Sequence, residues 1–178
     1  MGLLHSMRFD TFSALTAISG RWPLEYGKIV QILLAISFDP RRGGFAVLNH
    51  YSEGVDLELT LGADKFAVEV KTTEGDSFIL SEKDIVGLQA KSRNDSYTPA
   101  VAALRFQRSA DWVIGNADRL ITGSYTCDRL ALDSIIELEA IAKIQFERAV
   151  LELEQRVLRP PTGAPLDFLA SVLKDESS

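Results

Sequence analysis

Apolar and polar positions alternate along the chain in patterns typical of several helices. The sequence predicts helices over residues 9–19, 23–37, 81–93 and 130–158, and a short amphipathic one over 166–173. Pro23 is tolerated in a first helical turn, and Ser81 is a typical N-cap with acidic residues after it. Gly20 and the Pro160-Pro161 pair are expected to end the first and the longest of these helices.

Extended segments lie between the predicted helices. They cover residues 45–49, 55–61, 66–72, 99–106 and 112–114, and the second and third flank a turn and form a hairpin. The resulting order of elements predicts the α/β class, with a mixed central sheet flanked by helices and a long C-terminal helix. We expect residues 1–129 to form one α/β domain and residues 130–178 a helical extension, packed on that domain or on a second subunit.

Charged residues share one face of the predicted hairpin. Glu69 and Lys71 point the same way because side chains alternate along a strand. A two-residue loop would place Asp56 opposite Glu69, and a four-residue loop would place it opposite Lys71; both keep the three on one face. Two carboxylates about 5 Å apart repel, which suggests a shared proton or a divalent cation with oxygen ligands. The alternative is an ion-pair ladder on a solvated face.

A family resemblance rests on these residues. Asp56, twelve further residues and then Glu69-Val70-Lys71 at the end of an apolar strand resemble the PD-(D/E)xK nuclease signature. Within that superfamily the layout is most similar to archaeal Holliday-junction resolvases. The resemblance covers residues 23–106 and implies a restriction-endonuclease-like core.

Two further positions match the family, and two depart from it. Glu25 stands where those nucleases carry a glutamate in an upstream helix, and Gln89 stands where many carry a glutamine after the lysine strand. Val55 replaces the proline that often precedes the aspartate, and Arg93 replaces an aromatic residue that can follow the glutamine. Glu25 is equally well explained as a first-turn acid favoured by the helix dipole, and Gln89 as a helix-surface residue.

The resemblance implies a metal-dependent mechanism. Asp56 and Glu69 would bind the metal together with the carbonyl of Val70, and Glu25 would position a water or a second ion. Lys71 would orient or deprotonate the attacking water, or stabilise developing charge. Mg²⁺ is the expected cofactor, with Mn²⁺ as a substitute, because all these ligands are oxygens.

The charge balance limits how nucleic acid could be bound. The 178-residue chain has a net charge of −6 and an isoelectric point near 5.0, so we expect weak non-specific DNA affinity and marked salt sensitivity. Four basic residues could still meet DNA: Arg41, Arg42, Lys91 and Arg93. The alternative is that these are scattered, solvated charges.

Several classes of protein are excluded. The single cysteine, Cys127, rules out an internal disulfide and a multi-cysteine metal site. There is no phosphate-binding glycine motif, and no apolar run approaches the length of a membrane span. The N-terminus has too short an apolar stretch and too little positive charge for a secretory signal, so we expect a cytoplasmic protein without a membrane partner.

The long helix predicted over 130–158 carries two apolar rows. One row follows steps of three and four from Ile135 to Val157; the other contains Leu132, Ile136, Ala140 and Ile144. The surface helix of a single domain needs one such row, and the tail is too short to cover a helix of about 40 Å. We therefore expect a homodimer through this helix. The alternative is that the N-terminal helix and the tail together complete the core of a monomer.

Three functions remain. The first is a metal-dependent DNA endonuclease of repair or recombination, with branched or altered DNA as the candidate substrate. The second is a nucleic-acid-binding or assembly subunit with a nuclease-like core and little turnover, and the third is a nuclease that acts on RNA. The complete set of Glu25, Asp56, Glu69 and Lys71 favours the first over the second.

Overall fold

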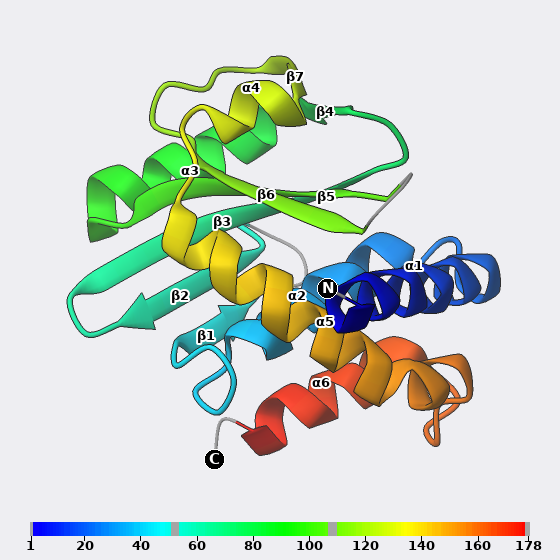
Figure 1. Ribbon diagram of the computed structural model, residues 1–178. Helices are drawn as coiled ribbons and strands as arrows, with labels where there is room; N and C mark the ends of the chain where they lie inside the picture. Colours follow the sequence, from blue (N-terminus) through cyan, green and yellow to red (C-terminus); the bar gives the residue numbers. More distant parts are fainter. Residues whose placement is uncertain (1, 51–53, 107–109, 177–178) are drawn as a thin grey trace.

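The computed structural model describes residues 2–50, 54–106 and 110–176 (Figure 1). In chain order, its elements are α1 (Gly2–Arg21), α2 (Tyr26–Phe38), β1 (Ala46–Asn49), β2 (Leu57–Leu61), β3 (Asp64–Thr73), β4 (Ser77–Leu80), α3 (Glu82–Asp95), β5 (Thr98–Arg105), β6 (Asp111–Asn116), β7 (Gly123–Thr126), α4 (Cys127–Ala131), α5 (Ile136–Leu158) and α6 (Pro165–Glu176).

A mixed sheet forms the centre of the described chain. Its five strands lie in the order β1-β2-β3-β5-β6, and β4 pairs with β7 in a separate two-stranded ribbon. β3 and β5 run parallel, whereas the other neighbours in the large sheet are antiparallel. The six residues of β5 from Pro99 to Leu104 are all buried, as expected of a strand covered on both faces. The α/β class and the mixed sheet flanked by helices are confirmed.

Helices cover the two faces of the sheet unequally. α2 and α5 lie against one face with α1 and α6 packed on them, while α3, α4 and the β4–β7 ribbon lie on the other side (Figure 1). The larger hydrophobic core joins α1, α2, α5 and α6 to the first face, and a smaller one fills the space under α3 and α4. The C-terminal helices therefore share a core with the sheet.

The hairpin has the two-residue turn. Leu57 pairs with Val68 and Leu61 with Asp64, which leaves Gly62 and Ala63 in the turn. Gly62 has a φ of +60°, a conformation that glycine adopts without strain and that the tight turns of hairpins require. This register places Asp56, immediately before β2, opposite Glu69.

The predicted helix over 130–158 is wrong at its start, because it is two helices. α4 ends at Ala131 and α5 begins at Ile136. Between them the backbone pairs with the edge of β6: Ile135 N–H donates to Ile114 O, and Asn116 N–H donates to Asp133 O. Local strand pairing replaces helical hydrogen bonds here.

Glu139 reinforces this junction from the first turn of α5. Its carboxylate accepts from Ile114 N–H at 3.2 Å, from the Ser134 hydroxyl at 2.9 Å and from Lys143 Nζ at 2.6 Å. Burial alone would raise the pKa of Glu139, but these donors outweigh it and hold the pKa below its usual 4.5. The carboxylate is therefore bound more strongly in its charged form.

The N-terminal helix is longer than predicted. α1 continues through Gly20 to Arg21, and its Ala14, Leu15 and Ile18 are buried against the core. Tertiary packing thus overrides the helix-ending preference of a single glycine.

The two apolar rows of the long helix have different surroundings. The row from Leu138 to Val157 is buried, with Phe146 edge-on to Trp112 at 5.1 Å between ring centres. Leu132, Ile136 and Ile144 are 72%, 77% and 53% exposed, and Ala140 between them is also exposed. We call these four residues the outer row; α1 and α6 pack on α5 but leave the outer row uncovered within the described chain.

Across the described residues, we find no helix with both the length and the apolar character needed to span a membrane.

Candidate active site

Three of the predicted residues meet where the hairpin opens. Asp56 lies immediately before β2, and its Oδ2 accepts a hydrogen bond from Val70 N–H at 2.9 Å. Glu69, in the middle of β3, is only 6% exposed. Lys71, two residues further along β3, donates from Nζ to Glu69 Oε1 at 2.8 Å. The parity of the hairpin thus brings two carboxylates and one ammonium together, and Lys71 reaches the start of α3.

The structure adds a third carboxylate, Asp84, at the start of α3. Asp84 forms a capping box with Ser81, since its side chain accepts from Ser81 N–H at 2.8 Å and its own N–H donates to Ser81 Oγ. Asp84 Oδ2 also accepts from Lys71 Nζ at 2.7 Å. The Ser81-x-x-Asp84 spacing was a signal for the cap, but not for the contact with Lys71.

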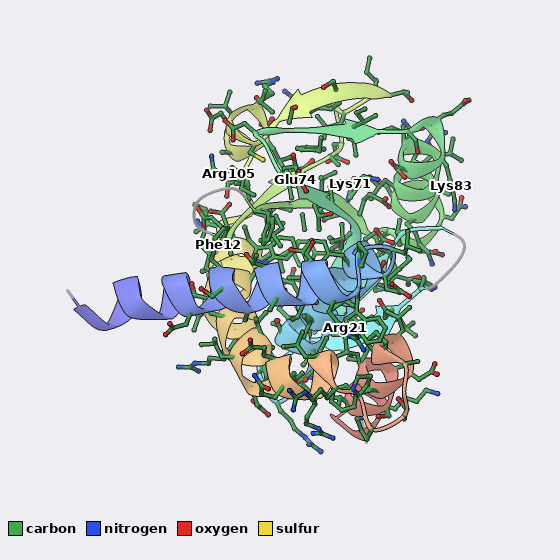
Figure 2. All side chains as sticks on the ribbon, turned by 90° about the vertical axis from the view of Figure 1, so that its right-hand side faces the viewer. Phe12, Arg21, Lys71, Glu74, Lys83 and Arg105 are labelled. Carbon is green, nitrogen blue, oxygen red and sulfur yellow. The ribbon has the colours of Figure 1, made fainter. Side chains whose placement is uncertain are left out.

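Lys71 is therefore held from two sides. Figure 2 shows it in the interior near α3, whereas Lys83 lies at the outer edge of that helix. Burial alone would lower the pKa of Lys71, but hydrogen bonds to Asp84 and Glu69 outweigh it and raise the pKa above its usual value. Without bound metal, Lys71 therefore stays an ammonium.

The pKa of Glu69, in contrast, is shifted against its charged form. Burial and then the nearby charge of Asp56 raise its pKa well above the usual value, although Lys71 pulls it down. The pKa of Asp84 is lowered instead. Burial alone would raise it, but the hydrogen bonds to Lys71 and the Ser81 backbone outweigh burial. Glu69 is therefore the carboxylate whose charged form this site stabilises least.

Sequence reasoning missed two residues of α2 at this site. Lys28 Nζ lies 3.3 Å from Asp56 Oδ1 and donates to Gln31 Oε1 at 2.7 Å. Gln31 is 2% exposed and donates from Nε2 to Asn49 Oδ1, His50 O and Asp56 O. The only sequence signal was their spacing of three and six residues after Glu25, which places all three on neighbouring parts of one helix surface.

Glu25 is half-buried at the N-cap position of α2, where its side chain makes no capping hydrogen bond. It lies one turn before Lys28, on the side of the helix that reaches Asp56. Among the described residues, no hydrogen bond or ion pair joins its side chain to Asp56 or Glu69.

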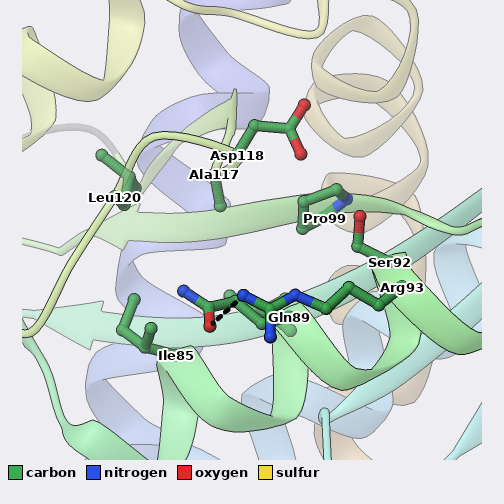
Figure 3. A pocket seen from close by; sticks show the side chains of 9 residues that line it. Ile85, Gln89, Ser92, Arg93, Pro99, Ala117, Asp118 and Leu120 are labelled. Atoms are coloured by element: carbon green, nitrogen blue, oxygen red, sulfur yellow. Dashed lines mark hydrogen bonds between the residues drawn. The ribbon is translucent and has the colours of Figure 1, made fainter.

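Gln89 is not brought to this cluster. It accepts a hydrogen bond from the Arg93 guanidinium at 3.4 Å and lines a cavity of about 140 Å³ on another side of α3 (Figure 3). The cavity lies between α3 and the segments around Pro99 and Asp118. The contact of α3 with Lys71 comes instead from Asp84.

The four basic residues predicted to meet DNA do not form one surface. Lys91 Nζ pairs with Glu58 Oε1 at 2.8 Å, and Arg93 contacts Gln89. Arg42 pairs with Glu152 of α5 at 2.9 Å, and Arg41 N–H donates to Asp39 Oδ1. Arg41 and Arg42 follow the end of α2, about 20 Å along a 13-residue helix from its start, where Lys28 lies.

A second polar cluster lies beside the first on the same face of the sheet. Glu58 is 6% exposed and accepts hydrogen bonds from Lys91, Tyr97 and His50, the last at 2.7 Å. Burial raises the pKa of Glu58, but these donors outweigh it and lower the pKa below the usual value. Because Lys91 belongs to α3 and Glu58 to β2, the pair anchors the helix over the hairpin.

The donor set fits a hard divalent cation. In the described part of the chain, no three or more His, Cys, Asp or Glu side chains are arranged to hold a metal ion. Mg²⁺ in proteins, however, is usually held by one or two carboxylates together with water and substrate phosphate oxygens. Asp56 and Glu69 are such a pair, and burial together with the nearby charge of Asp56 raises the pKa of Glu69.

Comparison with known proteins identifies no family. No protein-family model matches the chain, and no curated protein matches it. Among solved structures, Hjc of Archaeoglobus fulgidus, a Holliday junction resolvase from an archaeal hyperthermophile, is similar at a TM-score of 0.45 and 20% identity. The match covers 55% of this chain and 83% of that one. A likeness at this level assigns neither the fold family nor the function of the chain.

Proposed function

We propose that this chain is a Mg²⁺-dependent nuclease of the PD-(D/E)xK type that hydrolyses DNA phosphodiester bonds, with branched or altered DNA as its preferred substrate. The observation that carries the proposal is that Asp56, Glu69 and Lys71 lie together in the spacing of that signature, with Glu69 buried. Two close carboxylates under a helix are costly for a fold alone, because each loses hydration.

Each residue has a part in the proposed reaction. Asp56 and Glu69 would hold the metal together with the carbonyl of Val70. The metal would activate a water and stabilise negative charge on the phosphate. Lys71, fixed between Glu69 and Asp84, would present its ammonium to the reacting phosphate. Because its position is set before substrate arrives, little reorganisation is needed in the transition state.

A cleavage assay tests the proposal. Linear, flapped and four-way DNA and a matched RNA are incubated with Mg²⁺, Mn²⁺ or EDTA. We expect metal-dependent cleavage, strongest on branched DNA, and its loss in Asp56→Ala and Glu69→Ala. Calorimetry should show that both variants bind the metal much more weakly than the parent. If only RNA is cleaved, the substrate is RNA and the proposed DNA specificity is wrong. If neither metal supports cleavage of any nucleic acid, the proposal is rejected.

We also propose that two chains associate through α5. The outer row has Ile136, Ala140 and Ile144 on α5 and Leu132 just before it, and its apolar side chains are exposed to solvent. A two-fold dimer would cover it with the same row of the partner and would present two sites to a symmetric substrate.

A further inference from the structure

Asp56, one of the two proposed metal ligands, already has a cation beside it. One oxygen, Oδ2, is bound by the Val70 backbone N–H, a neutral donor that orients the carboxylate without competing for its charge. The other oxygen, Oδ1, faces the Lys28 ammonium at 3.3 Å. A metal bound to Oδ1 at about 2.1 Å would stand within a few ångströms of this ammonium.

Lys28 is directed to this place by its surroundings. Gln31 Oε1 accepts from Lys28 Nζ at 2.7 Å, and the Gln31 amide is itself fixed by donating to Asn49, to the His50 carbonyl and to the Asp56 carbonyl. Gln31 is buried and cannot turn without breaking these bonds. The acceptor that orients Lys28 is thus part of the network that positions the Asp56 backbone.

Lys28 is nevertheless more exposed and less tightly held than Lys71. Its side chain is 40% exposed, compared with 21% for Lys71, and Gln31 is a neutral partner. Lys71 is retained by two carboxylates, whereas Lys28 is retained by one and would lose that one to a metal. Like charges a few ångströms apart repel even near the protein surface, so the metal and the Lys28 ammonium compete for Asp56.

Building on the proposed function, we propose that Lys28 competes with the divalent metal for Asp56 and that the displaced ammonium binds a phosphate of the nucleic acid. The free chain then binds metal weakly, because it must first give up the Lys28–Asp56 pair. A bound phosphodiester supplies the anion that Lys28 loses, and metal binds more tightly once nucleic acid is present. By linkage, metal tightens nucleic-acid binding by the same factor.

The first test measures metal affinity without nucleic acid. Mn²⁺ is titrated calorimetrically into the parent chain, Lys28→Ala and Lys28→Arg, with Lys65→Ala as a control that removes the same charge from an exposed lysine at the start of β3. We expect Lys28→Ala to bind Mn²⁺ at least ten-fold more tightly, Lys28→Arg to resemble the parent, and Lys65→Ala to stay within two-fold of it. Circular dichroism checks that each variant is folded.

The second test measures the coupling. In a Lys71→Ala background, chosen to keep both metal ligands while preventing cleavage, four-way DNA should raise Mn²⁺ affinity, and adding Lys28→Ala should abolish that rise. Equal or weaker Mn²⁺ binding by Lys28→Ala than by the parent overturns this inference alone. Absence of Mn²⁺ binding in both chains overturns the inference and the proposed metal site together.

Discussion

Among single residues, Lys71 connects the most charges at the site. It contacts Glu69 and Asp84, and the charge of Asp56 acts on the same glutamate. The sequence placed Asp56, Glu69 and Lys71 on one face for a two-residue or a four-residue turn, and the structure has the two-residue turn. The sequence was insufficient for Lys28 and Asp84, since their contacts depend on where α2 and α3 lie over the sheet.

Replacing Lys71 should separate catalysis from folding. We expect Lys71→Ala to cut branched DNA at least a hundred-fold more slowly, because removing one preorganised charge from a transition state costs about 3–4 kcal/mol. Its affinity for the same DNA should change little. Single-turnover cleavage and fluorescence anisotropy measure the two quantities. Lys83→Ala, at the outer edge of α3, is the control, and cleavage within a few-fold of the parent would argue for a structural ion pair.

Glu139 should make stability depend on pH. At pH 7 its carboxylate is charged and accepts three hydrogen bonds, so Glu139→Gln should lower the free energy of unfolding by about 1–3 kcal/mol. Because the folded pKa is below 4.5, this contribution is complete above 4.5 and disappears as the pH falls through the folded pKa. Urea unfolding at pH 7 and at successively lower pH should therefore show that the free energies of unfolding of parent and variant converge as the pH falls. Glu137→Gln, its exposed neighbour, should match the parent throughout.

Among the elements, the junction between α4 and α5 shows where periodicity misleads. Apolar spacing continues across residues 130–158, yet the backbone at Asp133 and Ile135 pairs with β6. Side-chain spacing does not record a competing strand edge, so the break was not visible in the sequence. The strands β4 and β7 were not predicted, although β1, which has the same four-residue length, was. Gln89 shows the same limit, since its helix was predicted but the side it faces was not.

The close approach of β6 and α4 makes Gly115 sensitive to substitution. A Cβ at this position would lie 2.6 Å from both the carbonyl oxygen and a methyl carbon of Leu130. Gly115→Ala should therefore lower the free energy of unfolding by about 1–3 kcal/mol, as overpacking does, and more if the backbone cannot shift. Gly75→Ala is a matched control, because nothing lies within 4 Å of its Cβ position. Denaturant unfolding compares them, and equal stability of the two variants would contradict the packing.

For the whole molecule, the outer row is the feature from which we predict the oligomeric state. α1 and α6 pack on α5, as the monomer alternative requires, but leave Ile136 and Ile144 exposed. We expect sedimentation equilibrium at micromolar concentration to show twice the 19.6 kDa chain mass. The Ile136→Asp variant should sediment with the mass of a single chain. Leu24→Asp, at an even more exposed position on the loop before α2, should remain dimeric. A single 19.6 kDa species in the parent would remove the dimer and the paired cutting of symmetric substrates.

The two-residue turn of the hairpin leaves the site dependent on strand register rather than on loop length. Residues inserted between Gly62 and Ala63 would lengthen the loop and leave Leu61 paired with Asp64, so Glu69 and Lys71 would keep their face. A slip of β3 by one residue would instead carry both side chains through the sheet to the α2 side, away from Asp84, and a slip by two would restore their face with Asp56 opposite Lys71. Chains built on this plan can therefore vary the length of the turn, whereas a slip of the pairing by an odd number of residues separates the two carboxylates.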